Sequence, residues 1–194
     1  MGSFFKTDDE KFELLFNGKT LSAWDNGKKI KEWDAYSGKN IQVDNEPNGT
    51  VYMNNPKYQN QKGKGPTPEG LYTLGKFSRN MLTREAYKNL KEKPMDFNSA
   101  MTQSASALSS LVSAYVNDDF VRGANPRAWG DYRAELIPTK ETNTYGRTGM
   151  YLHGGDIPGS AGCIDLTNNI SDVVKFLENL NLKNPIKLRV RYDD

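Results

Sequence analysis

Near the N-terminus, hydrophobic and polar residues follow one another in short segments typical of β-strands. The segments cover residues 12–16, 20–24 and 30–36, and an Asn-Gly pair separates each from the next, at Asn17-Gly18 and at Asn26-Gly27. Asn-Gly favours two-residue type I′ turns between antiparallel strands. The pattern therefore predicts that the chain opens as a three-stranded antiparallel meander.

The middle of the chain changes character twice. Proline and glycine are frequent over residues 44–69, which predicts a loop with one short strand at 51–53, and a strand follows at 70–74. Farther on, apolar residues recur with a helical period over 81–90 and again over 97–116. We therefore expect a helical insertion at about residues 78–122 within an otherwise β-rich domain.

Strand patterns return in the C-terminal part. We expect strands at 134–138 and 149–153, a helix from about 170 to 180 capped by Asn168 or Asn169, and a last, half-buried strand at 186–192, where apolar and basic residues alternate. The predicted fold class is mixed and mainly β: a twisted sheet or sandwich with an inserted helical segment and a C-terminal helix. Residues 1–194 are expected to form a single domain.

Composition narrows the choice of function. The 194 residues are 36% hydrophobic, and 26 Lys and Arg against 24 Asp and Glu give a net charge of +2. This balance, without any basic block, predicts no nucleic-acid partner. No window approaches the roughly 18 consecutive apolar residues of a membrane span, and the first residues do not form a Sec signal.

The candidate chemistry lies in one glycine-rich segment, residues 151–166. It contains His153 and Cys163, which are the only histidine and the only cysteine of the chain and lie ten positions apart. A thiol needs a base or a positive charge to become a good nucleophile at neutral pH, and one histidine supplies this. Glycines let the backbone approach a substrate closely, so the N–H groups of Gly162 and Cys163 are the expected donors to an oxyanion.

The pair also has structural and metal-binding interpretations. A single cysteine is usually a small buried hydrophobic residue, and a single histidine is usually structural. A zinc site needs three or four ligands, and only Asp156 and Asp165 stand close enough in sequence to add to the pair. Because both residues share one glycine-rich segment, a catalytic pair is favoured, with no metal and no cofactor.

The order of the pair points to a family. The histidine precedes the cysteine, and Ser160, Gly162 and Cys163 stand in the run Ser-Ala-Gly-Cys-Ile. This run resembles the L,D-transpeptidase (YkuD-type) catalytic domain, whose signature is an upstream histidine and then Ser/Thr-His-Gly-Cys-hydrophobic. The N-terminal meander and the Pro-x-Gly-x-Tyr approach at 68–72 match the same family.

The sequence departs from this signature in two places. Ala161 replaces the second histidine, and Asp165 replaces the arginine that commonly follows the cysteine by two residues. With the short spacing from His153 to Cys163, these departures resemble the divergent, Tlde-like branch, the antibacterial L,D-transpeptidase effectors of type VI secretion systems.

The resemblance implies a substrate and a mechanism. Cys163 would attack the bond between the L-centre and the terminal D-alanine of a peptidoglycan tetrapeptide stem, with His153 as base. Water would release a tripeptide, and an amine would give exchange or transpeptidation. Ser160, near the imidazole, Gly154 and Asp165, which would orient a side chain or cap the turn, are supporting candidates. Tyr151 and Arg147 are candidates for binding stem carboxylates.

The resemblance also implies a setting. We expect a toxin that a secretion apparatus delivers, without a Sec signal, to the periplasm of a rival cell, and a periplasmic immunity protein as its partner. The alternatives are a housekeeping transpeptidase that forms cross-links, an inactive binder of cell-wall peptides, and a cysteine hydrolase of the cytoplasm unrelated to the cell wall.

Overall fold

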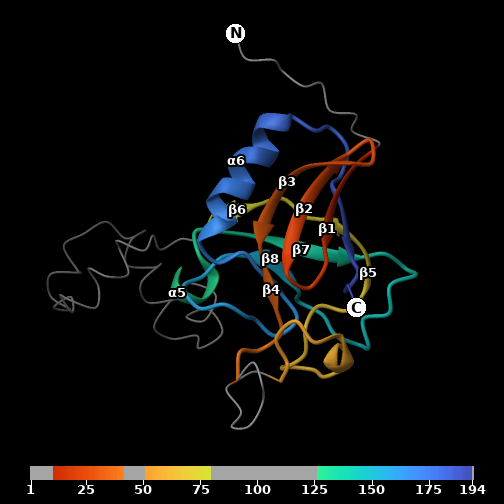
Figure 1. Cartoon of the computed structure of the whole chain (residues 1–194), viewed down its shortest axis with the longest axis vertical. Coiled ribbons are helices and arrows are strands. Elements are labelled where there is room, and N and C mark those ends of the chain that lie inside the picture. The colour runs from red at the N-terminus through yellow and green to blue at the C-terminus, as the bar shows by residue number, and fades with distance from the viewer. Residues whose placement is uncertain (1–10, 42–50, 80–125, 194) are drawn as a thin grey trace, which may run out of the picture.

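The structure is a computed structural model that describes residues 11–41, 51–79 and 126–193 (Figure 1). Its strands are β1 (Phe12–Phe16), β2 (Thr20–Asp25), β3 (Lys28–Asp34), β4 (Tyr36–Ser37), β5 (Gly70–Leu74), β6 (Ser78–Arg79), β7 (Tyr132–Pro138), β8 (Tyr151–His153), β9 (Ile164–Asp165) and β10 (Lys187–Val190). Its helices are the 3-10 helices η1 (Pro56–Tyr58) and η2 (Thr167–Asn169) and the α-helices α5 (Pro126–Trp129) and α6 (Ile170–Leu180). The prediction of a mainly β fold with a C-terminal helix is confirmed.

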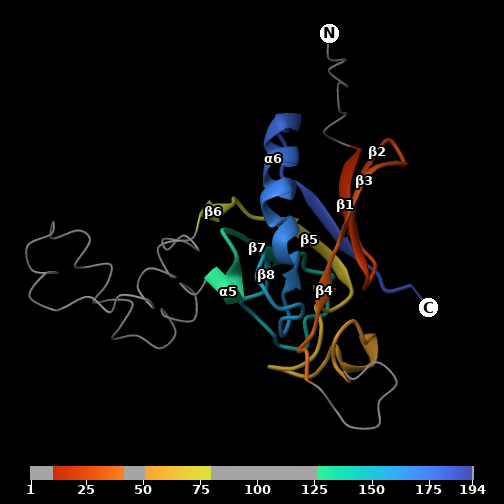
Figure 2. The ribbon, with the colours of Figure 1, turned by 60° about the vertical axis from the view of Figure 1, so that its left-hand side comes forward.

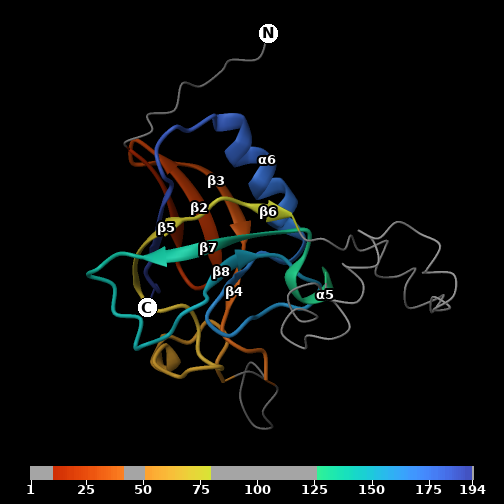
Figure 3. The same ribbon diagram turned by 180° about the vertical axis from the view of Figure 1, so that it is seen from behind.

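The strands of these residues form one sheet, in the order β3-β2-β1-β10-β5-β7-β8-β9-β4, with β6 added to β7. The two ends of this order, β3 and β4, are consecutive in the chain and are separated only by Ala35. The sheet therefore curls until its two ends meet, and Figure 1 shows β4 continuing from β3. Seen from behind, β5 and β7 run side by side as an antiparallel pair (Figure 3).

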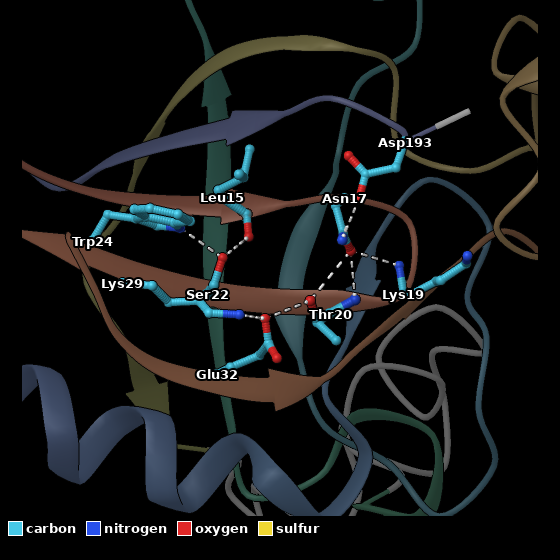
Figure 4. A network of polar contacts seen from close by, with 9 residues as sticks. All are labelled: Leu15, Asn17, Lys19, Thr20, Ser22, Trp24, Lys29, Glu32 and Asp193. Atoms are coloured by element: carbon cyan, nitrogen blue, oxygen red, sulfur yellow. Dashed lines mark hydrogen bonds and ion pairs between the residues drawn. The ribbon is translucent and has the colours of Figure 1, made fainter. Parts of the chain in front are cut away.

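The predicted meander is confirmed, but its two turns differ. Asn26 and Gly27 both have positive φ, 52° and 74°, as a type I′ turn requires. The type I′ turn predicted at Asn17-Gly18 is wrong, because only Gly18 has positive φ. There the side chain of Asn17 stabilises the loop instead: its Oδ1 accepts from the N–H groups of Lys19 and Thr20, and its Nδ2 donates to Asp193 (Figure 4).

The core fills the space inside the curled sheet. Phe12, Leu14 and Phe16 of β1 alternate with half-buried residues, and Leu188 and Val190 of β10 alternate with exposed basic ones, as the sequence predicted. Helix α6 lies between β1–β3 on one side and β7–β8 on the other (Figure 2). Its Phe176 ring packs edge-on against Trp33 of β3, with ring centroids 5.2 Å apart.

Three local predictions need correction. Residues 51–53 form bends and a turn rather than a strand. Asn169 does stand before α6, yet its φ and ψ are helical and its side chain makes no capping bond, because η2 leads directly into the helix. Ser78 and Arg79, placed in the helical insertion, form strand β6. The rest of the predicted insertion, from residue 80 to 122, lies outside the described residues.

Candidate active site

The parallel pairing of β8 with β9 brings His153 and Cys163 to the same face of the sheet. Leu152 is aligned with Ile164, and both side chains are fully buried in the core. Since side chains alternate along a strand, the residues on either side of these two point to the opposite face. That face carries Tyr151 and His153 from β8, Asp165 from β9, and Cys163, which directly precedes β9. We call these four residues the site face.

Strand β7 extends the site face by two residues. In the antiparallel pairing of β7 with β8, Arg133 stands opposite His153, and Glu135 stands opposite Tyr151. One row across three strands is therefore Arg133, His153 and Asp165. The next row contains Glu135 and Tyr151, with Cys163 just beyond the end of the β8–β9 pairing.

The imidazole of His153 is held as a neutral base. Its Nδ1 lies 2.5 Å from the carbonyl oxygen of Gly154, which fixes the proton on Nδ1 and leaves a lone pair on Nε2. Among the described residues Nε2 has no hydrogen-bond partner, although the side chain is only 1% exposed. Burial, with a smaller contribution from the charge of Arg133, lowers the pKa of His153 to about 4, and the Gly154 carbonyl opposes the shift.

Gly154 thus supports the site through its backbone. In addition to the contact with the imidazole, its N–H donates to the carbonyl of Trp129 at 3.2 Å. A side chain could not be added at this position without displacing α6, because a Cβ atom would lie 2.5 Å from Cγ2 of Ile170. The loop after β8 therefore depends on a glycine here.

The thiol of Cys163 is buried and protonated at rest. Burial raises its pKa to about 11, and the charge of Asp165 contributes in the same direction. Two hydrogen bonds to the sulfur oppose this increase in the pKa. One comes from the N–H of Tyr151, whose nitrogen lies 3.3 Å from Sγ, and the other from the Ser160 hydroxyl. Ser160, which the sequence placed near the imidazole, therefore interacts with the Cys163 thiol.

Asp165 caps the turn instead of orienting a side chain. Its Oδ1 accepts from the N–H of Thr167 at 2.8 Å, and a backbone hydrogen bond from Gly159 also reaches the carboxylate. Burial nevertheless raises its pKa to about 6. Of the two roles that the sequence left open, the structure supports the cap.

Of the two backbone N–H groups predicted to bind an oxyanion, that of Gly162 is already hydrogen-bonded within the protein. The N–H of Gly162 donates to the carbonyl of Gly65 at 3.0 Å, so it is directed away from a substrate, and this part of the prediction is corrected. Two hydroxyls hold the same turn from behind: Ser37 donates to the Cys163 carbonyl at 2.7 Å, and Thr67 to the Gly162 carbonyl at 3.1 Å. The N–H of Cys163 is the remaining candidate of the predicted pair.

Arg147 has a structural role. The sequence offered it as a candidate for binding stem carboxylates, but the contacts of its guanidinium do not support this. Its side chain is 5% exposed, and its guanidinium donates to the carbonyls of Gln59, Pro66 and Gly65 at 2.6–2.9 Å. It packs so closely behind the turn at Gly162 and Cys163 that a Cβ on Gly162 would lie 2.5 Å from its Nη2. Its charge also lowers the pKa of Cys163.

Two residues of the site were missed from the sequence. The Trp129 ring lies 4.7 Å from the His153 ring and 5.7 Å from that of Tyr151, while Arg133 lies over both Trp129 and Tyr151. Strand alternation around the buried Ala134 could have placed Arg133 on the outer face of its strand. Trp129, at the end of a four-residue helix, has no comparable sequence signal.

A sequence comparison identifies the family. The profile of the Tlde1 domain matches residues 31–189, which is most of the chain. The chain belongs to the Tlde1 domain family. The resemblance to the effector branch of the L,D-transpeptidases is thereby confirmed, and both His153 and Cys163 lie within the matched region. No curated protein matches this Tlde1 domain chain in sequence.

Solved structures were also compared with this Tlde1 domain. Bd1075 of Bdellovibrio bacteriovorus is 16% identical, with a TM-score of 0.44 over 94% of this chain and 47% of that protein. L,D-transpeptidase 1 of Mycobacterium tuberculosis and an L,D-transpeptidase of Mycobacterium smegmatis are each 14% identical, with a TM-score of 0.40 over 93% of this chain. The Tlde1 chain spans 60% and 58% of those two proteins.

Two further findings concern the described part of the Tlde1 domain. No three His, Cys, Asp or Glu side chains gather there around a position where a metal ion would fit. No helix in these ranges has both the length and the apolar character needed to cross a membrane.

Proposed function

We propose that this chain is a cysteine acyl-transfer enzyme that acts on peptidoglycan tetrapeptide stems, as an L,D-carboxypeptidase, a D-amino-acid exchange enzyme, or both. One observation carries the proposal: His153, with a free lone pair on Nε2, and the Cys163 thiol lie on one face of β8 and β9. Membership of the Tlde1 domain family supports the choice of substrate.

The protonation states of the pair suggest the first step. Since burial disfavours both the thiolate and the imidazolium, the proton moves from Sγ to Nε2 as sulfur attacks the carbonyl carbon, and not before. The resulting oxyanion is stabilised by the N–H of Cys163, and a donor of this kind contributes roughly 3–4 kcal/mol in comparable sites. His153 then protonates the amine of the terminal D-alanine, which leaves.

The second step resolves the thioacyl enzyme. Water attacks the thioester carbonyl, gives its proton to His153, and releases a tripeptide stem and the free thiol. A D-amino acid in place of water restores a tetrapeptide with a new terminal residue. Gly154 keeps the imidazole in the required tautomer through both steps, because its carbonyl oxygen holds the Nδ1 proton.

The proposed biological role is that of an antibacterial toxin. Removal of the terminal D-alanine from tetrapeptides depletes the donors for cross-links, so the wall of the target cell weakens. This role places the protein in the periplasm of a rival cell after delivery by a secretion apparatus, with an immunity protein protecting the producer. Family membership and the resemblance of the His153–Cys163 segment support it.

Purified muropeptides test the chemistry. We expect the protein to convert tetrapeptides to tripeptides, and to exchange the terminal residue when a D-amino acid is added, both detected by liquid chromatography with mass spectrometry. Cys163→Ala and His153→Gln should each lower the rate by roughly a thousandfold or more, because either change removes a partner of the proton transfer.

The alternatives predict other results in the same assay. Cross-linked dimers as the main product would identify a housekeeping transpeptidase, and binding without any product would identify a cell-wall peptide binder.

Expression in a Gram-negative host tests the toxin role. When the protein is fused to a Sec signal it should lyse the cells, whereas the Cys163→Ala variant should be harmless. Toxicity that persists in Cys163→Ala would contradict the proposed role.

A further inference from the structure

Arg133 lies beyond His153 as seen from the nucleophile. Cys163 directly precedes β9, His153 is on β8, and Arg133 is on β7 directly opposite His153. The three side chains therefore follow one another across three neighbouring strands on the site face. Adjacent strands are about 4.8 Å apart, so each step across the sheet corresponds to a few covalent bonds of a bound peptide.

Two aromatic rings lie beside the Arg133 guanidinium. Its central carbon lies 5.5 Å from the centroid of the Trp129 ring and 5.8 Å from that of Tyr151. A guanidinium that lies over an aromatic ring still presents its N–H groups, which point outward in its own plane and match the two oxygens of a carboxylate. Within the described ranges no carboxylate forms an ion pair with Arg133.

The proposed reaction places a carboxylate at this distance. The amine that His153 protonates belongs to the terminal D-alanine, whose carboxylate is separated from that nitrogen by one carbon atom. If sulfur attacks from the side of Cys163, the leaving residue extends over His153 toward β7. The other candidate for carboxylate binding, Arg147, is excluded because three backbone carbonyls already occupy its buried guanidinium.

We propose that Arg133, flanked by Trp129 and Tyr151, binds the terminal carboxylate of the residue that is cleaved from the stem, and the carboxylate of an incoming D-amino acid during exchange. This inference rests on the proposed function. It makes the enzyme selective for bonds next to a free C-terminus, because a stem whose fourth residue continues into a cross-link lacks the carboxylate that Arg133 recognises.

A pair of ligands tests this specificity without turnover. In the Cys163→Ala background, calorimetry compares a tetrapeptide stem that ends in a free D-alanine with the same stem ending in D-alanine amide. We expect the acid to bind about 10- to 100-fold more tightly, the range of a bidentate, charge-assisted pair. Arg133→Gln should reduce this preference to near one, and Arg133→Lys should leave an intermediate preference, since lysine retains the charge without the planar fork.

A neighbouring arginine provides the matched control. Arg79 on β6 is exposed and pairs with Tyr132, so its side chain lies on the face opposite to that of Arg133. Arg79→Gln removes the same charge and should preserve the preference for the acid. Loss of that preference in Arg79→Gln would show that net charge alone attracts the stem, and it would overturn the inference.

Other outcomes separate this inference from the proposed function. Equal binding of acid and amide by the Cys163→Ala protein, or an equal loss of both in Arg133→Gln, would overturn the role of Arg133. Turnover of muropeptides with no dependence of KM on the terminal carboxylate would overturn it while the proposed function stands. The last outcome combines two results: the preference for the acid is lost only in Arg133 variants, and the protein that retains Cys163 does not turn over muropeptides. This outcome would support carboxylate recognition by Arg133 and contradict the proposed function.

Discussion

At the scale of single residues, burial favours the uncharged forms of both His153 and Cys163. The sequence suggested that His153 would raise the thiolate fraction of Cys163. In the structure burial dominates, since it raises the pKa of the thiol to about 11 and lowers that of the imidazole to about 4. We therefore expect no stable thiolate–imidazolium pair at neutral pH. In the proposed mechanism the proton moves from Cys163 to His153 only as sulfur attacks.

The pH dependence of alkylation tests this protonation state. The rate of modification of Cys163 by iodoacetamide, followed by mass spectrometry, should increase about tenfold per pH unit from pH 7 toward 10, because the thiolate fraction increases in this way below the pKa. The His153→Gln variant should show a similar slope. A plateau between pH 6 and 8 that disappears in His153→Gln would demonstrate a preformed ion pair instead.

At the scale of elements, the loop before β5 fixes the turn at Gly162 and Cys163. Gly65 accepts the Gly162 N–H, Thr67 donates to the Gly162 carbonyl, and Arg147 ties Gln59, Gly65 and Pro66 to the same place. Gly162 itself has φ of +82°, which favours glycine, and no room for a side chain on the side of Arg147. The position of Cys163 thus depends on a segment about a hundred residues earlier in the chain.

Replacement of Arg147 tests this support. Arg147→Met should lower the free energy of unfolding by about 3 kcal/mol or more, because buried carbonyls of the loop lose charge-assisted hydrogen bonds. Urea unfolding measures the change. Arg189→Met is the control: Arg189 is exposed and pairs with Glu13 at 3.5 Å, so the loss should stay below about 1 kcal/mol. Equal losses in the two variants would contradict the structural role of Arg147.

At the scale of the whole molecule, two buried groups on the site face act on stability in opposite directions. The lowered pKa of His153 contributes stability that is present above pH 6.5 and is lost as the pH falls toward 4. The raised pKa of Asp165 contributes stability that is present below pH 3.8 and is lost as the pH rises through about 6. Each contribution is about 3 kcal/mol, so between pH 6.5 and 4 they largely cancel.

Removal of one of these groups should reveal the other. The Asp165→Asn variant retains an acceptor for the Thr167 N–H but does not titrate. As the pH falls from 6.5 to 4, the free energy of unfolding of this variant should decrease by about 3 kcal/mol, because nothing offsets the loss of the His153 contribution. The unmodified protein should show almost no decrease over the same range. Urea unfolding at a series of pH values measures the difference. Parallel pH profiles for the two proteins would show that Asp165 titrates normally.

The sequence by itself determined the features that depend on neighbouring residues. Alternation of apolar and basic side chains located β10, and short strand-like segments located β1, β5 and β7. The Asn26-Gly27 pair predicted a turn, which the positive φ values of both residues confirm. The glycine-rich segment around His153 and Cys163 indicated the family, because the order and spacing of these residues are local properties of the chain. The helical insertion and the roles of the pair in catalysis remain predictions.

Tertiary structure alone decided what each polar group contacts. Arg147 and Arg133 are the same residue type, yet only the folded chain buries the first against carbonyls and places the second beside His153. In the same way, the N–H of Gly162 is occupied by Gly65, nearly a hundred residues earlier. The pairing of strands and the packing of loops against turns depend on burial of the whole core. A short stretch of sequence therefore cannot predict them.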